Sequence, residues 1–416
     1  MLPWLVAHPL LSRLLVFVAA LCVAWLINLA IITQAFHKRP IGAWNPPRNN
    51  RSRVWLDWLP VIGWWRMRRE LRDDPKDRQW LRPLLIELLF PLAMVWLYDA
   101  HVSGKLLPIE RMAMTLQAEL HSLFAAQFVL ISLMAIATFI DFDEQLIPDT
   151  ITIPGTIFGL VGSATFLSWF PLIPFARTMM EMDAASRNAW PAWLNGPWGL
   201  ALGLLITSVW CFALLDRVWI TRRGWIRAPR YFIAVIFRTR WWMVVLCLWI
   251  VIVVGLFVAW SMPIIRWQYL LSALFGLAFA GGITWAVRIA AALALRVEAL
   301  GFGDVTLMAM IGTFIGWQPS LLVFFVAPLI AVLIFALRYF LFGSGEGPYG
   351  PYLCIATLVV ILFWDRFEKS YAAPILELPP WVTFLILGLA VVMLGAMLWV
   401  YRLIKGTAHG LRPRAG

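Results

Sequence analysis

The sequence has few cysteines and few charged residues. Its four cysteines, Cys22, Cys211, Cys247 and Cys354, are scattered through apolar stretches and form no C-x-x-C pair. This pattern argues against a disulfide framework or a zinc site and indicates buried, unreactive thiols. Charged residues make up only 13% of the chain, hydrophobic residues make up 62%, and the mean hydropathy is +0.81. A soluble domain cannot hide so much apolar surface, so the sequence predicts an integral membrane protein.

The chain carries a net charge of +12, which raises the question of a nucleic-acid partner. The basic residues lie mainly in short loops between apolar runs, where positive charge orients membrane helices. No basic helix face with interleaved aromatic residues is present, so no nucleic acid is expected as a partner. Many of the 26 tryptophans flank the apolar runs, as interfacial anchors do in a lipid bilayer.

The long apolar runs predict an all-α, polytopic membrane protein with about eleven transmembrane segments. The first run lacks a polar cleavage region and leads into a basic loop, so a removable signal peptide is not expected. The expected segments are residues 10–36, 83–100, 120–140, 151–172, 197–215, 241–262, 268–295, 303–318, 320–342, 351–364 and 381–403.

The distribution of Arg and Lys predicts the orientation of these segments. The dense basic loop from His37 to Arg82 is expected in the cytoplasm. Counting helices from there places the basic loop 216–240 and the basic C-terminal tail on the same side. This agreement supports an N-terminus in the periplasm and a C-terminus in the cytoplasm of a bacterial inner membrane. The loop 141–149 and the segment 296–304 also fall on the cytoplasmic side.

Two acidic motifs stand out against this apolar background. The first is the stretch 139–154, which holds Asp141, Asp143, Glu144, Pro148 and Asp149 between two apolar helices. The second is the stretch 301–317, in which Gly301, Gly303 and Asp304 open another apolar helix. Ionisable residues at a membrane are costly, so such positions are candidates for a functional site. Glycines permit close backbone approach, and a helix N-terminus favours a negative charge.

The predicted topology places Asp141 and Asp304 at one membrane face, which makes them the candidate catalytic pair. Two carboxylates in contact do not both ionise easily, so they share a proton. The ionised group of such a pair takes a proton from water as the water attacks a peptide carbonyl, and the protonated group donates to the developing oxyanion. This hydrolysis requires no metal and no other cofactor.

Structural explanations of the same residues remain open at this point. A single Gly-x-Gly-Asp is a weak signal, because glycine is common in membrane helices. The stretch 141–149 is also compatible with a solvated turn in which Asp149 caps the next helix and Asp143 and Glu144 face water.

The two motifs resemble those of the prepilin peptidases, or type IV leader peptidases, which are GxGD-type aspartic proteases. Asp141 through Asp149 resembles the family's first motif, and Gly301 through Trp317 resembles its Gly-x-Gly-Asp motif. Three further stretches look similar to family elements in the same order. They are residues 25–40, residues 59–64 with 82–88, and residues 348–353, which read Pro-Tyr-Gly-Pro-Tyr-Leu.

The resemblance implies a membrane aspartic endopeptidase that removes the short basic leader of type IV prepilins or of type II secretion pseudopilins at the cytoplasmic face. It implies that Asp141 and Asp304 are catalytic. Asp149, Pro148, Gly301, Gly303, Asp143 and Glu144 then bind substrate or support the site. An acidic patch of Asp141, Asp143, Glu144 and Asp149 is expected to attract the basic leader.

The chain departs from the family in its N-terminal cytoplasmic loop. The family's paired C-x-x-C motifs are absent, because the stretch 40–77 contains no cysteine, and zinc is therefore not supported. The family's N-methylation with S-adenosylmethionine is linked to that region, so the resemblance does not carry this activity to the chain. Thr306 also stands where the family often has lysine.

The distance between the two Asp motifs is unusually long for the family. Four parts are expected: membrane helices with the basic loop (1–140), the first Asp motif with its helix (141–196), an inserted helical hairpin with an Arg-rich loop (197–262), and the second Asp motif with the C-terminal helices (263–416). An inserted pair of helices leaves both Asp residues on the same side of the membrane.

Three other functions fit parts of the sequence. A presenilin-type protease also uses Gly-x-Gly-Asp, but Tyr98-Asp99 falls at the opposite face and residues 327–329 have the wrong order for its third motif. A proton-coupled transporter would use acids near the midplane or internal repeats, and neither is evident. A non-catalytic membrane scaffold remains compatible. The sequence does not indicate the oligomeric state.

Overall fold

The computed structural model describes residues 8–34, 54–68, 80–102, 114–165, 191–215, 240–295, 300–342, 347–367, 382, 385–393 and 396. Within these ranges every regular element is helical, as the sequence predicts. The α-helices are α2 (Pro9–Gln34), α3 (Ile62–Met67), α4 (Leu81–Val102), α5 (Met114–Glu144), α6 (Asp149–Thr165), α7 (Pro197–Ala213), α10 (Trp241–Ser261), α11 (Ile264–Leu295), α12 (Phe302–Ile315), α13 (Trp317–Phe342) and α14 (Gly350–Phe367). Two short 3-10 helices are η1 (Trp55–Trp58) and η3 (Ala192–Asn195).

Six of the described helices are long and apolar enough to cross a membrane, so the chain is a multi-pass membrane protein. They lie at Pro9–Gln34, Leu81–Val102, His121–Glu144, Trp241–Ser261, Arg266–Leu295 and Trp317–Leu341. Helices α7, α12 and α14 are apolar but shorter. Ten of the eleven predicted segments overlap a helix. Of the last, 381–403, only residues 382, 385–393 and 396 are described, and they are helical.

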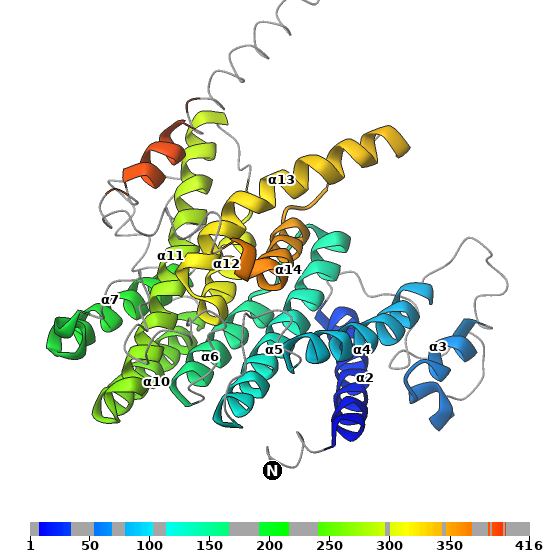
Figure 1. Ribbon diagram of the computed structural model, residues 1–416. Helices are drawn as coiled ribbons and strands as arrows, with labels where there is room; N and C mark the ends of the chain where they lie inside the picture. Colours follow the sequence, from blue (N-terminus) through cyan, green and yellow to red (C-terminus); the bar gives the residue numbers. More distant parts are fainter. Residues whose placement is uncertain are drawn as a thin grey trace, which may run out of the picture.

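Helix α12 lies at the centre of the helical assembly (Figure 1). Every residue from Asp304 to Ile315 is buried, and α12 packs against α5, α6, α11, α13 and α14. The closest approach is to α11, at Gly276 and Gly312. A Cβ atom on either glycine would collide with the carbonyl oxygen of the other. Small residues at such a crossing let two membrane helices come into backbone contact, which fixes the position of α12 along the axis of α11.

A buried carboxyl group joins the N-terminal helices. Glu87 of α4 is only 1% exposed. Its Oε1 accepts hydrogen bonds from Asn28 Nδ2 of α2 and Trp64 Nε1 of α3, both at 2.9 Å. Its Oε2 accepts one from the backbone N–H of Val61, at 2.6 Å. A buried carboxylate is stable only when its lone pairs are satisfied, so Glu87 fixes the short helix α3 onto α2 and α4.

Helices α4 and α5 run antiparallel, as contacts at their two ends show. Arg82, at the start of α4, pairs with Asp143 at the end of α5. Tyr98, near the end of α4, contacts His121 Nε2 through its hydroxyl group, at 3.0 Å. Tyr98 and Asp99 therefore lie at the end of α4 that is remote from Asp143.

Helices α7 and α10 form a helical pair. Trp249 Nε1 of α10 donates to Ser208 Oγ of α7, at 3.0 Å, and Trp241 Nε1 donates to the carbonyl oxygen of Leu214, at 3.2 Å. Both helices also pack on α11. The insertion of this pair into the family's architecture stays a prediction, and the Arg-rich loop between the two helices lies mostly outside the described residues.

The expected loop 141–149 is shorter than predicted. Helix α5 continues through Asp141, Asp143 and Glu144, and α6 already begins at Asp149. The four residues between them contain Gln145, whose φ of 54° is left-handed and stops the helix. In this last turn of α5, Asp143 pairs with Arg82 of α4.

Candidate active site

Asp141 lies in the last turn of α5 and is only 4% exposed. The N–H of Gln145 donates to the carbonyl oxygen of Asp141, at 2.9 Å, which closes that turn. Residues 146–148 form no regular element. The carbonyl oxygen of Pro148 accepts from the N–H groups of Ile151 and Thr152, at 3.1 and 3.4 Å. The connection is therefore short and anchored at both ends.

Asp304 lies in the first turn of α12 and is 7% exposed. Gly301 is the N-cap residue, with extended backbone angles, and its backbone lies close to the Asp304 carboxyl group. The helix dipole also favours negative charge at this position, as expected from the sequence.

The fold brings Asp141 and Asp304 together, and their carboxyl groups are close enough to interact electrostatically. Ile147 lies between their two helices and a third one. A Cβ atom on Gly303 would approach the Cβ of Ile147 to 2.8 Å, and one on Gly350 would approach its Cδ1 to 2.8 Å. Glycine at both positions thus allows the starts of α12 and α14 to pack closely against the α5–α6 connection beside the acidic pair.

The N-terminus of α14 provides a third wall of the site. The backbone N–H of Gly350, the first residue of α14, donates to Asp141 Oδ2 at 3.1 Å. A Cβ atom on Gly350 would collide with the same oxygen. Gly350 was not among the predicted site residues, although it stands in the Pro-Tyr-Gly-Pro stretch that carries part of the family resemblance.

Tyr349, directly before α14, is half-buried at the same place. Burial, and then the negative charge of Asp304, raise the pKa of the Tyr349 phenol above its ordinary value. The phenol therefore stays protonated and keeps a donor hydrogen beside the acidic pair. Its ring packs edge-on against Tyr352, with the ring centroids 6.4 Å apart.

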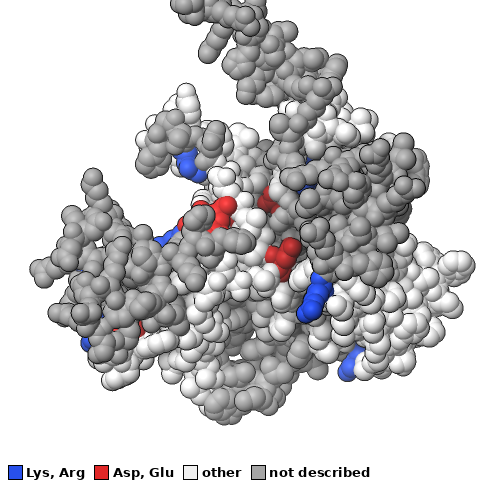
Figure 2. All heavy atoms as spheres, turned by 180° about the vertical axis from the view of Figure 1, so that it is seen from behind, with Lys and Arg blue, Asp and Glu red and all other residues white. Residues whose placement is uncertain are grey.

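The other predicted acidic residues lie at the rim. Asp143 is exposed and forms a bidentate pair with Arg82, with both N–O distances 2.8 Å. Glu144 is half-buried, and Asp149 is exposed at the first position of α6. Viewed from behind, the surface shows several acidic side chains near its middle, with basic side chains close to them (Figure 2).

A separate apolar cavity of about 510 Å³ lies between α7, α11 and α12. Val305, Thr306 and Ala309 line it, whereas Asp304 does not. Its wall includes the exposed side chains of Leu205, Val209, Phe212 and Trp285. The cavity therefore lies on the side of α12 that faces away from the acidic pair, and it is not part of the carboxylate site.

Comparison with known sequences identifies the region around Asp304. A model of the type IV leader peptidase family matches residues 232–337. This region of the chain is similar to the type IV leader peptidase family. The matched region holds α10 to α12 and most of α13, and thus Gly301, Gly303 and Asp304. Asp141 and Gly350, which the fold brings to Asp304, lie outside the matched residues.

Curated relatives carry the name prepilin leader peptidase/N-methyltransferase. The chain is 32% identical to the Pseudomonas aeruginosa protein over 102 residues, which are 24% of this chain and 35% of that relative. It is 31% identical to the Aeromonas salmonicida protein over 98 residues, 23% of this chain and 33% of that relative. The Stutzerimonas stutzeri protein is 32% identical over 77 residues, 18% of this chain and 27% of that relative.

The matched part spans about a third of the length of these relatives. No solved structure matches the chain.

Proposed function

We propose that this chain is a membrane aspartic endopeptidase that removes the basic leader from type IV prepilins or type II secretion pseudopilins. The observation that carries the proposal is the meeting of Asp141 and Asp304, two buried carboxyl groups from separate motifs. The names of the similar proteins support the substrate class. In this proposal Asp141 and Asp304 are the catalytic pair.

The pair has the surroundings that acid–base hydrolysis requires. Two interacting carboxyl groups in a buried site hold one proton between them more readily than none. The ionised group accepts a proton from the attacking water, and the protonated group donates to the oxygen of the scissile carbonyl. As the C–N bond breaks, the leaving amine takes a proton from the pair and a hydroxyl of the tetrahedral intermediate returns one to it, so the pair again holds one proton. The reaction uses no metal and no S-adenosylmethionine.

The Gly350 N–H donates to Asp141 Oδ2, and the Gly301 backbone lies close to the Asp304 carboxyl group. These contacts position the two carboxyl groups for action on water or substrate. The protonated phenol of Tyr349 adds a hydrogen-bond donor at the same place.

The substrate would approach with its leader on the cytoplasmic side, where Glu144 and Asp149 add negative charge near the pair. Opposite charge near the site favours binding of a basic peptide and speeds its association. The apolar segment that follows the leader would lie in the bilayer among the helices. In this proposal the N-terminus faces the periplasm and the C-terminus faces the cytoplasm.

Cleavage in cells tests the function. The chain is co-expressed with a prepilin from the same source, and leader removal is followed by electrophoretic mobility and intact mass. Wild type is compared with Asp141→Asn and Asp304→Asn at equal membrane levels. Leader loss with wild type alone supports the proposal. Uncut prepilin with wild type would favour a scaffold or a transporter.

A further inference from the structure

Arg82 contacts the C-terminal end of α5 at two residues, one on each side of Asp141 in the sequence. Its two terminal nitrogens donate to the two carboxylate oxygens of Asp143, both at 2.8 Å. The guanidinium carbon also lies 5.2 Å from the centre of the Phe139 ring, over its face. A single side chain from α4 thus holds both Phe139 and Asp143.

These two residues share one face of α5, and Asp141 lies on another. Positions four residues apart stack on the same side of a helix. A position midway between them points about 200° around the axis, away from both. Asp141 points accordingly to the opposite side, where the Gly350 N–H meets its Oδ2 at 3.1 Å.

We propose that Arg82 is a positioning residue for Asp141, because it holds the last turn of α5 from the side opposite the active site. Helix ends fray, and the turn that carries Asp141 is the last before the left-handed Gln145. The Arg82 contacts prevent this turn from unwinding and so keep the Asp141 carboxylate against Gly350. The proposal rests on the proposed function only where peptide cleavage is measured, and amide exchange tests it independently.

The proposal also assigns a role to Asp143. In place of attracting the basic leader, its carboxylate is the anchor for Arg82. The side chains of Arg82 and Asp143 are 30% and 28% exposed, so water screens the pair only partly. Planar, bidentate pairing is specific to arginine, and lysine offers no equivalent geometry.

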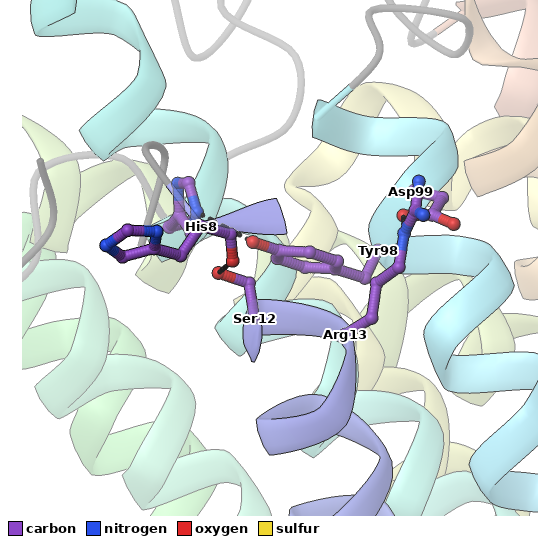
Figure 3. Close-up of polar contacts among 6 residues, drawn as sticks. His8, Ser12, Arg13, Tyr98 and Asp99 are labelled. Atoms are coloured by element: carbon purple, nitrogen blue, oxygen red, sulfur yellow. Dashed lines mark hydrogen bonds and ion pairs between the residues drawn. The ribbon is translucent and has the colours of Figure 1, made fainter. Parts of the chain in front are cut away.

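The test compares three variants, Arg82→Ala, Asp143→Ala and the double variant, with a matched control. The control is Arg13→Ala, which breaks a single-contact, more exposed Arg–Asp pair at the far end of α4. There Arg13 Nε lies 2.8 Å from Asp99 Oδ1 (Figure 3). Purified full-length proteins in detergent are assayed on a prepilin peptide, and backbone amide exchange is followed by mass spectrometry.

We call the contacts of Arg82 with Phe139 and Asp143 the clamp. If the clamp positions Asp141, removing either Arg82 or Asp143 should lower activity equally. Both single variants should lower kcat about 10- to 100-fold with little change in KM, and the double variant should be no worse than the poorer single one. Exchanging the pair, Arg82→Asp with Asp143→Arg, should restore part of kcat. Arg82→Lys should not.

Amide exchange tests the proposal without any activity. In Arg82→Ala, the peptide that contains Gly350 should exchange at least about tenfold faster, because its N–H loses a fixed acceptor. Arg13→Ala should leave that peptide unchanged. If wild type cuts no prepilin, the proposed function fails, and the exchange result alone decides on the clamp.

Two outcomes would overturn the clamp. One is unchanged exchange at Gly350 in Arg82→Ala. The other is a rise in KM for a basic leader, but not for a neutral one, in Asp143→Ala alone, which would return Asp143 to leader binding.

Discussion

The N–H of Gly350 donates a hydrogen bond to Asp141 Oδ2 across 209 residues of sequence. This contact links the Pro-Tyr-Gly-Pro stretch at the start of α14 to the first acidic motif, at the end of α5. Gly303, beside Asp304, approaches the same connection through Ile147. Three motifs that are far apart in the chain thus form one site around α12.

A side chain at position 350 should disable the site. In Gly350→Ala the added Cβ would meet Asp141 Oδ2 and come within 2.8 Å of Ile147 Cδ1. We expect kcat to fall about 100-fold, because the carboxylate has to move away from its working position. Gly255→Ala in α10 is the matched control, since its Cβ would have no neighbour within 4 Å. Equal kcat values for the two variants, in a peptide cleavage assay, would contradict the role of Gly350.

Glu87 should matter for stability. Glu87→Ala leaves the donors of Asn28, Val61 and Trp64 without their acceptor in a buried place. We expect the free energy of unfolding to fall by about 3 kcal/mol. Asp99→Ala, at the exposed pair with Arg13, should cost at most about 1 kcal/mol. Thermal unfolding in detergent measures both, and a smaller loss of Tm for Glu87→Ala than for Asp99→Ala would refute the assignment.

The crossing of α11 and α12 should tolerate no side chain. Gly312→Ala would place a Cβ against the backbone of Gly276, and we expect a loss of about 1 to 3 kcal/mol from overpacking. Gly282→Ala, also in α11, meets nothing within 4 Å and should be neutral or slightly stabilising. Unfolding curves of the two variants that coincide would show that the backbones do not meet as described.

Much of this architecture is readable from the sequence. Apolar runs identify the helices, because a lipid-facing helix needs a continuous apolar stretch. The glycines before Asp304 predict its place at a helix start. The end of α5 was predicted wrongly because Asp143 and Glu144 read as loop residues. The partner that keeps Asp143 in a helix, Arg82, lies 61 residues earlier.

Tertiary contacts account for what the sequence does not reveal. The Pro-Tyr-Gly-Pro stretch has no ionisable residue apart from Tyr349. Its role at the site becomes visible only when the fold places it beside Asp141. The same holds for Ile147, an ordinary apolar residue whose importance comes from the two glycines it touches. Local patterns predict elements, whereas pairings over tens to hundreds of residues decide which elements meet.

Activity should depend on pH because catalysis needs one proton shared between Asp141 and Asp304. At low pH both carboxyl groups are protonated and no general base is available, so the rate should fall. At high pH both are ionised and no acid remains, so the rate should fall again. We expect a bell-shaped profile of kcat/KM for a prepilin peptide. If kcat/KM instead reaches a plateau at low or at high pH while the protein stays folded, the pair does not act through a shared proton.

The most direct test of the central claim is single-turnover cleavage of a prepilin peptide by purified wild type, Asp141→Asn, Asp304→Asn and the double variant. Product masses identify the bond that is cut. If the two carboxyl groups act as one unit, each single variant should lose at least about 1,000-fold, and the double variant should lose little more. A single variant that keeps more than about a tenth of the wild-type rate would show that its Asp is not part of the catalytic pair.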